Sequence, residues 1–456
     1  MEFEDLRAKV LEVADSAIKY AKDSGVPSAE AFVFNQKINN VSDNNSKIDS
    51  RLGMVQGLGI RVAVGKQVGF ASCTGFELET IKQAINQAHS VAKVSPANPM
   101  FNGFVADTKT AKEGLLEPDI LNLNADEITS YLDTINQEIY RDDQRIISTS
   151  IGVRISWGGY AVGTTEGCLS SSLTTSFTAF CSNVVAEAGE RKTGNDFVVG
   201  RKIKDLDGIG VNAVKKAIDG LGAKKFEGSE ILPSIWETRP VSSFLSVALG
   251  FLFSGSSYVE KSNPWGEKLN QQVAVEDFNA IDDGQNPEYI RTASIDTEGT
   301  PRGKTVTIEK GILKSFLFDR MYGKAADKTT TGNANRGFGA PAFESAPVIM
   351  PNTIIIKNIG KNIDEQIAEI DKGILIRSEP IGLFTANRAT GDFSVTCNHG
   401  FLIERGEIVY PLKSFGLAGN YFKTFNDIQQ IGSDREITGD MLQSPSITFK
   451  NHTISG

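Results

Sequence analysis

Three histidines and four cysteines limit the nucleophilic chemistry open to this 456-residue sequence. Cys397 and His399 lie two residues apart, so an extended strand would place both side chains on one face. A thiol beside an imidazole could supply a nucleophile and its general base. Alternatively, the glycine after His399 turns the chain and the pair has no catalytic role. His89, on the polar side of an expected helix, and His452, in the final tail, are expected to be exposed to solvent.

Asp296 and Glu298 are a second candidate, because two carboxylates that alternate along a strand can face the same side. Such a pair could act as general acid and general base. The residues that follow them, Gly299-Thr300-Pro301, favour a different role. Carboxylates next to a glycine and a proline commonly fix a turn by accepting backbone hydrogen bonds. The sequence favours the turn over the acid/base pair.

A third group combines Thr331, Gly332 and Asn333 with Arg336. Backbone N–H groups, an amide and a guanidinium together suit the binding of a peptide backbone or a carboxylate. We therefore predict these four residues as a candidate substrate-binding site. The alternative is that Thr331 and Asn333 satisfy their own turn and Arg336 pairs with an acid.

The run from Phe244 to Phe253 contains Phe, Leu, Val and Ala without an ionisable group, which predicts a buried helix. Together with three motifs and the closing Ser444-Pro445-Ser446, this helix resembles the TldD/PmbA family. The motifs are Asp296-Thr297-Glu298-Gly299-Thr300-Pro301, Thr331-Gly332-Asn333-Ala334-Asn335-Arg336 and Thr390-Gly391-Asp392-Phe393. The resemblance runs over nearly the whole chain.

The family pairs a TldD-type subunit, whose helix carries an HExxxH motif, with a TldE (PmbA) type that lacks it. In this chain the two histidines of that motif fall on Ser246 and Phe251, and its glutamate falls on Val247. A zinc hydrolase needs three protein ligands and a carboxylate beside the metal-bound water. The resemblance also implies that a cysteine near the C-terminus completes the metal site of the TldD type. Residues 444–449 of this chain contain no cysteine. The chain therefore resembles the TldE type.

This resemblance implies a metal-free subunit of a cytosolic TldD/TldE-like metalloprotease assembly that acts on unfolded peptides. No catalytic residue and no cofactor is expected in this chain; zinc is expected in a TldD-type partner, and the chain is not expected to be active alone. One alternative is a homodimeric binding or regulatory protein without peptidase activity, in keeping with the family's older description as a modulator of DNA gyrase. A weaker alternative is a metal-independent peptidase with Cys397 as nucleophile.

Composition narrows the choice of partners. The 47 Lys and Arg residues against 56 Asp and Glu give a net charge of −9, which opposes binding to nucleic-acid phosphates. The longest apolar stretch, 244–253, is about half the length of a membrane helix, and the N-terminus lacks the pattern of a signal peptide. We expect a cytoplasmic protein with reduced cysteines that does not bind a membrane.

The pattern along the chain predicts an α+β protein with mostly antiparallel sheets and flanking helices. Apolar residues at helical spacing predict helices over 6–21 and 77–91, at the Asn124–Glu127 and Asn362–Glu365 capping boxes, and over 208–221. β-Branched and aromatic runs predict strands at 29–34, 57–64, 66–72, 146–157, 160–165 and 169–186, and in the C-terminal half at 304–309, 312–318, 353–357, 400–404 and 407–410. Tight hairpin turns are expected at Gly65-Lys66, Lys310-Gly311 and Arg405-Gly406.

Two stretches rich in turn residues or charge, 95–121 and 222–234, predict boundaries between domains. We expect an N-terminal α+β domain at 1–100, a central α+β domain at 120–222 and a C-terminal α+β domain at 235–456. No internal repeat stands out in the sequence.

Overall fold

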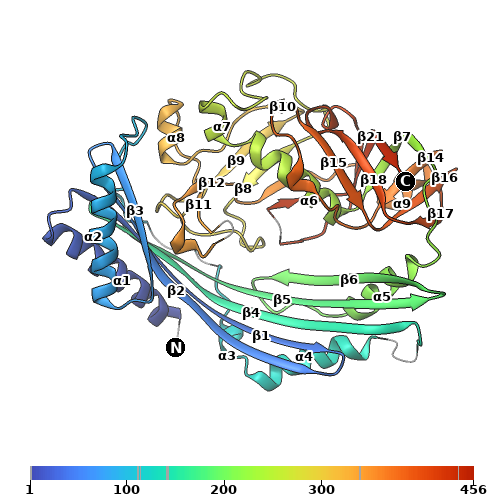
Figure 1. Cartoon of the computed structure of the whole chain (residues 1–456), viewed down its shortest axis with the longest axis horizontal. Helices are drawn as coiled ribbons and strands as arrows, with labels where there is room; N and C mark the ends of the chain where they lie inside the picture. The colour runs from blue at the N-terminus through green and yellow to red at the C-terminus, as the bar shows by residue number, and fades with distance from the viewer. Residues whose placement is uncertain (1–2, 110–111, 113, 140–142, 338–339, 440) are drawn as a thin grey trace.

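A long, curved sheet of six antiparallel strands forms the N-terminal half of the molecule in the computed structural model (Figure 1). The structure describes residues 3–109, 112, 114–139, 143–337, 340–439 and 441–456. The strand order is β3-β2-β1-β4-β5-β6. Its strands are β1 (Ser28–Asn44), β2 (Ile48–Val64), β3 (Gln67–Thr74), β4 (Ile146–Thr164), β5 (Leu169–Glu187) and β6 (Glu190–Gly200). The segments expected as separate N-terminal and central domains thus contribute three strands each to one sheet.

The two halves of this sheet repeat one order of elements, although the sequence shows no repeat. In the first half α1 (Phe3–Asp23) precedes β1 to β3 and α2 (Leu78–Val94) follows them. In the second half α3 (Pro118–Asn122) and α4 (Ala125–Gln137) precede β4 to β6, and α5 (Ile209–Asp219) follows. The closing helix of each half packs on a glycine of the third strand: Gly69 faces Ala88 and Ala92, and Gly194 faces Ala213 and Ala217. The repeat lies in topology and packing, not in residue identity.

Strands β1 and β2 are each 17 residues long, well beyond the predicted 29–34 and 57–64. The outer part of β1, 35–44, is rich in Asn, which has low strand propensity. The outer part of β2, 48–56, mixes apolar residues with Asp49, Ser50, Arg51 and Gly53. These parts are strands because β1 lies between β2 and β4 and bonds to both along its length. The predicted strands at 146–157 and 160–165 likewise merge into β4, whereas β10 ends at Leu313, short of the predicted 318.

Helices cover one face of the sheet, and the C-terminal region covers part of the other (Figure 1). Ala31 and Val33 of β1 pack with residues of α1 and α2, whereas Phe32, between them, packs against Ile295 and Phe343 of the C-terminal region. This is the alternation expected when both faces of a strand are buried. The sheet therefore links the N-terminal helices to the C-terminal region.

The C-terminal region contains two larger sheets with helices packed between and around them. One has the order β15-β18-β21-β7-β14-β16-β17, with β19 paired to β21, and the other has the order β10-β9-β8-β13-β20. Their bounds are β7 (Ser229–Trp236), β8 (Ala280–Asp283), β9 (Lys304–Glu309), β10 (Ile312–Leu313), β13 (Ile354–Ile356), β14 (Lys372–Ile376), β15 (Asp392–Cys397), β16 (Gly400–Glu404), β17 (Glu407–Leu412), β18 (Phe415–Asn420), β19 (Ile428–Ile431), β20 (Leu442–Gln443) and β21 (Ile447–Ser455). A two-stranded sheet joins β11 (Ala334–Asn335) to β12 (Val348–Ile349).

The helices of this region are α6 (Thr238–Leu252), α7 (Gly255–Val259), α8 (Arg320–Ala325), α9 (Ile363–Ala368) and α10 (Tyr421–Thr424), with 3₁₀ turns η1 (Ala342–Glu344) and η2 (Leu383–Thr385). Most strand pairs are antiparallel, with parallel pairs at β7–β14 and β13–β20. The predicted class, α+β with mostly antiparallel sheets and several domains, is confirmed. Within the described chain, no helix is both long and apolar enough to cross a membrane.

The close approach of helix to strand at Gly69 gives a test of this packing. A Cβ at residue 69 would lie 2.2 Å from the Ala88 carbonyl oxygen, so Gly69→Ala must push α2 away from β3. We expect a loss of about 2 kcal/mol in the free energy of unfolding, measured by denaturant titration. Gly194→Ala should behave alike. Gly53→Ala is the matched control, because the nearest atom to its Cβ is 4.0 Å away; equal stability of the Gly69 and Gly53 variants would contradict this packing.

Candidate functional site

Helix α6 is positioned by a fully buried aromatic cluster. Phe244 on its inner face stacks on Trp236 of β7, with ring centroids 4.6 Å apart, and contacts Phe393 of β15 at 5.0 Å and Tyr421 of α10 at 4.9 Å. Leu245, Leu249 and Leu252 continue the same buried face. The predicted buried helix is therefore present, and its inner face is held from three directions.

The three positions that correspond to the HExxxH residues lie on the other, half-exposed side of α6. Ser246, Val247 and Phe251 are all partly buried. The Ser246 hydroxyl donates to the Ser243 carbonyl at 2.8 Å, within the same helix. Val247 and Phe251 pack at the margin of the hydrophobic core. This face of α6 presents hydrocarbon and one internally bonded hydroxyl.

A pocket opens over Val247 and Phe251. Its other walls are the 383–388 segment and the residues Gly391, Tyr421 and Phe422. The free space is about 30 Å³, roughly the volume of one water molecule. Phe384, 79% exposed, stands at its rim, and the Arg388 guanidinium lies 5.8 Å from the centroid of the Phe251 ring. The space over this face of α6 is therefore small, and its lining is mainly apolar.

The C-terminal stretch that carries the closing Ser-Pro-Ser lies against the same helix. The Ser444 N–H donates to the Ser242 hydroxyl at 3.1 Å, one turn before Ser246. Met441 lies against Gly250, at 3.3 Å from the position of a Cβ. The two segments expected to hold zinc in a TldD-type subunit are therefore neighbours here. The side chains present, two serine hydroxyls, a valine and a phenylalanine, do not fit zinc, which prefers imidazole, thiolate and carboxylate.

No three His, Cys, Asp or Glu side chains come together as a possible metal site in the part of the chain that the structure describes. The buried surroundings of Cys397 and His399 do not favour a reactive pair. Burial raises the pKa of the Cys397 thiol to about 12 and lowers the pKa of His399 to about 4. The Nε2 atom of His399 is buried without a hydrogen-bond partner. A neutral thiol beside so weak a base is poorly suited to nucleophilic catalysis.

The expectation that His452 is exposed is wrong. This residue lies on β21 with 1% exposure, and its Nδ1 atom is 2.6 Å from the Ser234 hydroxyl. Its ring packs 5.2 Å from that of Phe449. The tail that ends the sequence is a central strand of a sheet, so its polar residues are taken into the core.

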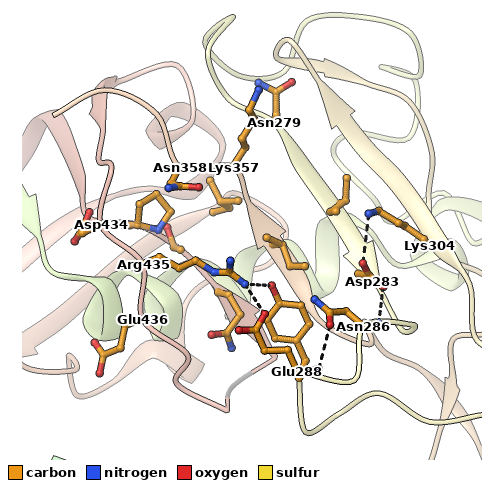
Figure 2. Close-up of a pocket in the computed structure, with 17 residues that line it drawn as sticks. Asn279, Asp283, Asn286, Glu288, Lys304, Lys357, Asn358, Asp434, Arg435 and Glu436 are labelled. Atoms are coloured by element: carbon orange, nitrogen blue, oxygen red, sulfur yellow. Dashed lines mark hydrogen bonds and ion pairs between the residues drawn. The ribbon is translucent and has the colours of Figure 1, made fainter. Parts of the chain in front are cut away.

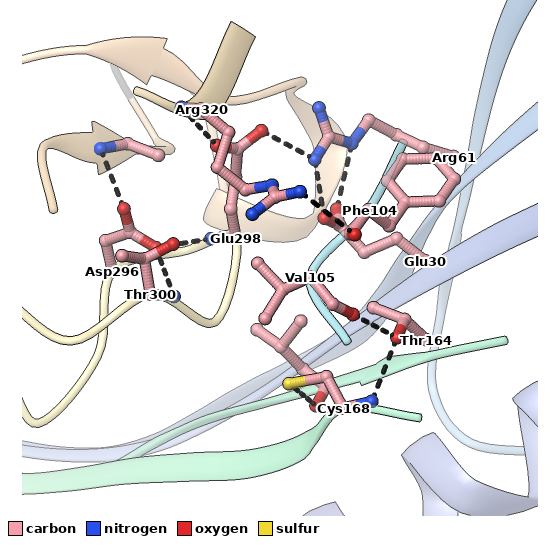
Figure 3. Close-up of polar contacts among 12 residues, drawn as sticks. Glu30, Arg61, Phe104, Val105, Thr164, Cys168, Asp296, Glu298, Thr300 and Arg320 are labelled. Atoms are coloured by element: carbon pink, nitrogen blue, oxygen red, sulfur yellow. Dashed lines mark hydrogen bonds and ion pairs between the residues drawn. The ribbon is translucent and has the colours of Figure 1, made fainter. Parts of the chain in front are cut away.

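Two of the family motifs, 296–301 and 331–336, meet at a buried network of charges between the N-terminal sheet and the C-terminal region (Figure 3). Arg61 of β2 contacts Glu30 of β1 at 2.9 Å and Glu298 of the Asp-Thr-Glu-Gly-Thr-Pro motif at 2.9 Å. Arg336 also donates to Glu30, at 2.6 Å from the same Oε1 atom that accepts from Arg61 Nε. The side chains of Glu30 and Arg336 are 1% and 0% exposed. Burial lowers the pKa of Arg336 to about 10, so it stays charged at neutral pH.

Asp296 fixes the turn of its motif, as the sequence favours. Its Oδ1 atom accepts the N–H groups of Glu298 at 3.0 Å and Thr300 at 2.9 Å, and its Oδ2 atom accepts the Ala334 N–H at 3.2 Å. Burial, and then the Glu298 charge, raise the pKa of Asp296 to about 7. Glu298 is committed to Arg61, so the pair serves the junction rather than an open site.

The four predicted substrate-binding residues lie together, and their polar groups are used inside the chain. Asn333 donates to Asp282 at 2.8 Å and to the Met350 carbonyl at 3.1 Å. The Thr331 hydroxyl donates to the Asn333 side-chain oxygen at 2.6 Å. Gly332 has φ +73°, and a Cβ there would lie 2.3 Å from the Pro301 carbonyl. The structure gives these residues and Arg336 a structural role; a role in substrate binding stays a prediction.

A polar pocket of about 400 Å³ went unpredicted, because four distant segments form it (Figure 2). Ile281 of β8 and Ile355 of β13 line it, and along their strands they alternate with residues of the core that contains α6. Its charges come as neighbours of opposite sign: Arg435 contacts Glu288 at 2.9 Å, and Lys304 lies 3.5 Å from Asp283. Ser444 and Pro445 form part of its wall. The pocket offers hydrogen-bonding groups, but its lining contains neither histidine nor cysteine.

Comparison with known proteins agrees with this architecture. Residues 229–456 match the family model of the PmbA/TldA metallopeptidase C-terminal domain, and 29–92 and 118–221 match its domain 1 and central domain. The chain is 25% identical to a metalloprotease TldD homologue of Buchnera aphidicola, over 88% of this chain and 86% of that protein.

Two solved structures share the fold over nearly their full lengths. TldE from Thermococcus kodakarensis is 24% identical with a TM-score of 0.84, covering 97% of this chain and 100% of that one. A proposed modulator of a DNA gyrase from Thermotoga maritima is 20% identical with the same TM-score, covering 97% and 99%.

The buried network predicts strong coupling between Glu30 and Arg336. Glu30→Gln and Arg336→Met should each lower the free energy of unfolding by about 3 kcal/mol, because each leaves an uncompensated buried charge. The double variant should lose clearly less than the sum, since neither charge then remains unpaired. Arg7→Ala, which removes a pair with the exposed Glu4, is the control and should change stability by no more than about 0.5 kcal/mol. Additive losses in denaturant titrations would argue against the network.

Asp319 lies beside this network, and its titration should make the free energy of unfolding depend on pH. Burial, and then the Glu298 charge, raise its pKa to about 7, above the value of about 4 in an unfolded chain. The folded protein therefore holds this proton more tightly, and stability falls as the pH rises from about 4 to about 7. Asp319→Asn keeps the α8 N-cap to Tyr322 and removes the titration, so the fall should be shallower. The free energy of unfolding is measured by urea titration at several pH values in this range. If it falls equally steeply with pH in the Asp319→Asn variant and in the unchanged chain, the assignment is refuted.

Proposed function

The chain belongs to the TldD/PmbA metallopeptidase family, and we propose that it is a metal-free, TldE-type subunit of a proteolytic assembly. In this proposal a TldD-type partner supplies zinc and activates the water. This chain shapes the chamber and helps to hold an extended, unfolded peptide. It has no catalytic residue of its own and works in the cytoplasm.

One observation carries the proposal. Ser246, Val247 and Phe251 occupy the half-exposed face of α6, next to the stretch where Ser444 meets Ser242. The family's arrangement of helix and closing stretch is kept, while the side chains at the corresponding positions are hydroxyl and hydrocarbon. Such a site cannot lower the pKa of a bound water or polarise a carbonyl in the way a zinc site does.

The apolar rim of the α6 pocket supports a role in holding substrate. Phe384, which lines the pocket, is 79% exposed. Exposed aromatic and aliphatic side chains next to a groove are typical of surfaces that bind unfolded peptide. The adjacent Arg388 adds a positive charge that suits a peptide carboxylate.

The proposal is tested by measuring metal content and peptidase activity of the purified chain, alone and mixed with a TldD-type chain. We expect activity only in the mixture, with zinc bound to the TldD-type chain. Phe384→Ala in this chain should raise the KM of the mixture about tenfold without changing its zinc content, because an apolar contact to substrate is lost. Val94→Ala, which trims a similarly exposed side chain on α2, is the control.

The other outcomes separate the alternatives. Activity of this chain alone that disappears on chelation would overturn the proposal. Chelator-resistant activity that is lost in Cys397→Ala would instead indicate a metal-independent peptidase. Lack of co-elution and of activity with any TldD-type chain would favour a homodimeric regulatory protein.

A further inference from the structure

The outer half of β2 is an open sheet edge. On its far side from β1, β2 pairs with β3, and this pairing covers only Gly57 to Val64. Toward the other end, from Ile48 to Met54, every residue is exposed, and within the described chain no strand pairs with this side. Ile48 and Leu52 are 60% and 75% exposed. An edge of this length with apolar side chains is a template for pairing with another strand.

The backbone of this edge has a defined pattern. The Gln56 carbonyl accepts the Gly75 N–H at 3.1 Å on the β3 side, so Gln56 directs its polar groups outward. Lys47 exchanges hydrogen bonds with Asn44 of β1, so it directs them inward. Since successive residues of a strand alternate, Ile48, Ser50, Leu52 and Met54 present free N–H and C=O groups at the open edge.

The side chains along this edge are self-complementary about Ser50. Asp49 and Arg51 flank it with opposite charges, and Ile48 and Leu52 flank these with apolar groups. Asp49 and Arg51 form an exposed ion pair with each other at 2.7 Å, at side-chain exposures of 48% and 79%. If a second copy of this strand paired antiparallel about Ser50, the Asp49 carboxylate of each copy would lie opposite the Arg51 guanidinium of the other.

We propose that β2 pairs with β2 of a second copy of this chain, antiparallel, about a two-fold axis at Ser50. Asp49 then lies opposite Arg51 of the partner subunit, and Ile48 lies opposite Leu52 of the partner subunit, each contact occurring twice. The outward N–H and C=O groups of Ile48, Ser50 and Leu52 meet those of the partner subunit. The two six-stranded sheets become one continuous sheet.

The register follows from charge and backbone together. A two-fold axis at Leu52 also matches the outward backbone groups, but it sets Asp49 opposite Val55 and Arg51 opposite Gly53, so neither charge is met. Axes at Asp49 or Arg51 fail because those residues direct their backbone groups toward β1. The Ser50 axis satisfies both conditions. An isologous contact of this kind closes as a dimer and does not propagate.

The contact is short, because the β1–β2 turn limits it. Asn45 and Ser46 have φ of 52° and 67°, so the strand ends just before Ile48. A ladder of about five residues per subunit is smaller than a standard stable interface, which predicts a dimer that forms and dissociates with protein concentration. This contact lies in the N-terminal sheet, away from α6. The proposed dimer therefore does not depend on the proposed function, and each can fail without the other.

Sedimentation of the full-length chain over a wide range of concentration tests the proposal. Arg51→Asp places two carboxylates opposite each other twice and should weaken self-association about tenfold. Asp49→Arg should weaken it similarly. The double variant, Asp49→Arg with Arg51→Asp, restores opposite charges across the axis and should return the dissociation constant to within about threefold of the original. Arg191→Asp, with the same charge change on the opposite edge strand β6, is the control and should have no effect.

Two further variants at Ser50 test the strand pairing itself. Ser50→Pro removes the outward N–H at the axis and should abolish self-association while leaving the thermal unfolding midpoint nearly unchanged, since edge strands tolerate proline. Ser50→Cys should form a disulfide-linked dimer on mild oxidation, whereas Gln56→Cys, beyond the ladder, should not. A chain that stays monomeric at all concentrations, a dimer insensitive to both Arg51→Asp and Ser50→Pro, or an edge that pairs only with a TldD-type chain would overturn the proposal.

Discussion

The structure depends on the burial of one carboxylate, Glu30, between two guanidinium groups. Glu30 lies at the start of the central strand β1, and it is 1% exposed with Arg61 on one side and Arg336 on the other. A charge buried this deeply must be paired, because leaving it unpaired costs several kcal/mol. Since Arg61 also binds Glu298, the network joins the N-terminal sheet to two loops of the C-terminal region and fixes their relative orientation.

This constraint explains why the sequence motifs that could do chemistry are used for structure. Asp296 accepts hydrogen bonds within its turn, Asn333 donates to the buried Asp282, and Arg336 pairs with Glu30 at the junction. The junction holds the C-terminal region, which contains α6 and the closing stretch, against the N-terminal sheet. The chain can therefore retain the family architecture while its α6 pocket holds valine and phenylalanine.

Sequence patterns predicted the local features well. Asn124–Glu127 and Asn362–Glu365 are capping boxes, and the hairpins turn at Gly65, Lys310 and Arg405, each with a positive φ. They did not predict contacts between distant residues. Arg336 and Glu30 are 306 positions apart, and β1 pairs with β4 across the expected domain boundary. Such pairings depend on which surfaces the whole chain brings together, and no local pattern encodes them, as the polar outer half of β1 illustrates.

The central claim is that the α6 site of this chain is closed to a catalytic metal by its own side chains. Diffraction at the zinc absorption edge, from crystals of this chain grown with zinc, tests it most directly. The account predicts no anomalous peak between α6 and the 441–446 stretch, while a TldD-type chain treated in the same way gives a strong one. A peak within bonding distance of side chains on α6 in this chain would contradict it.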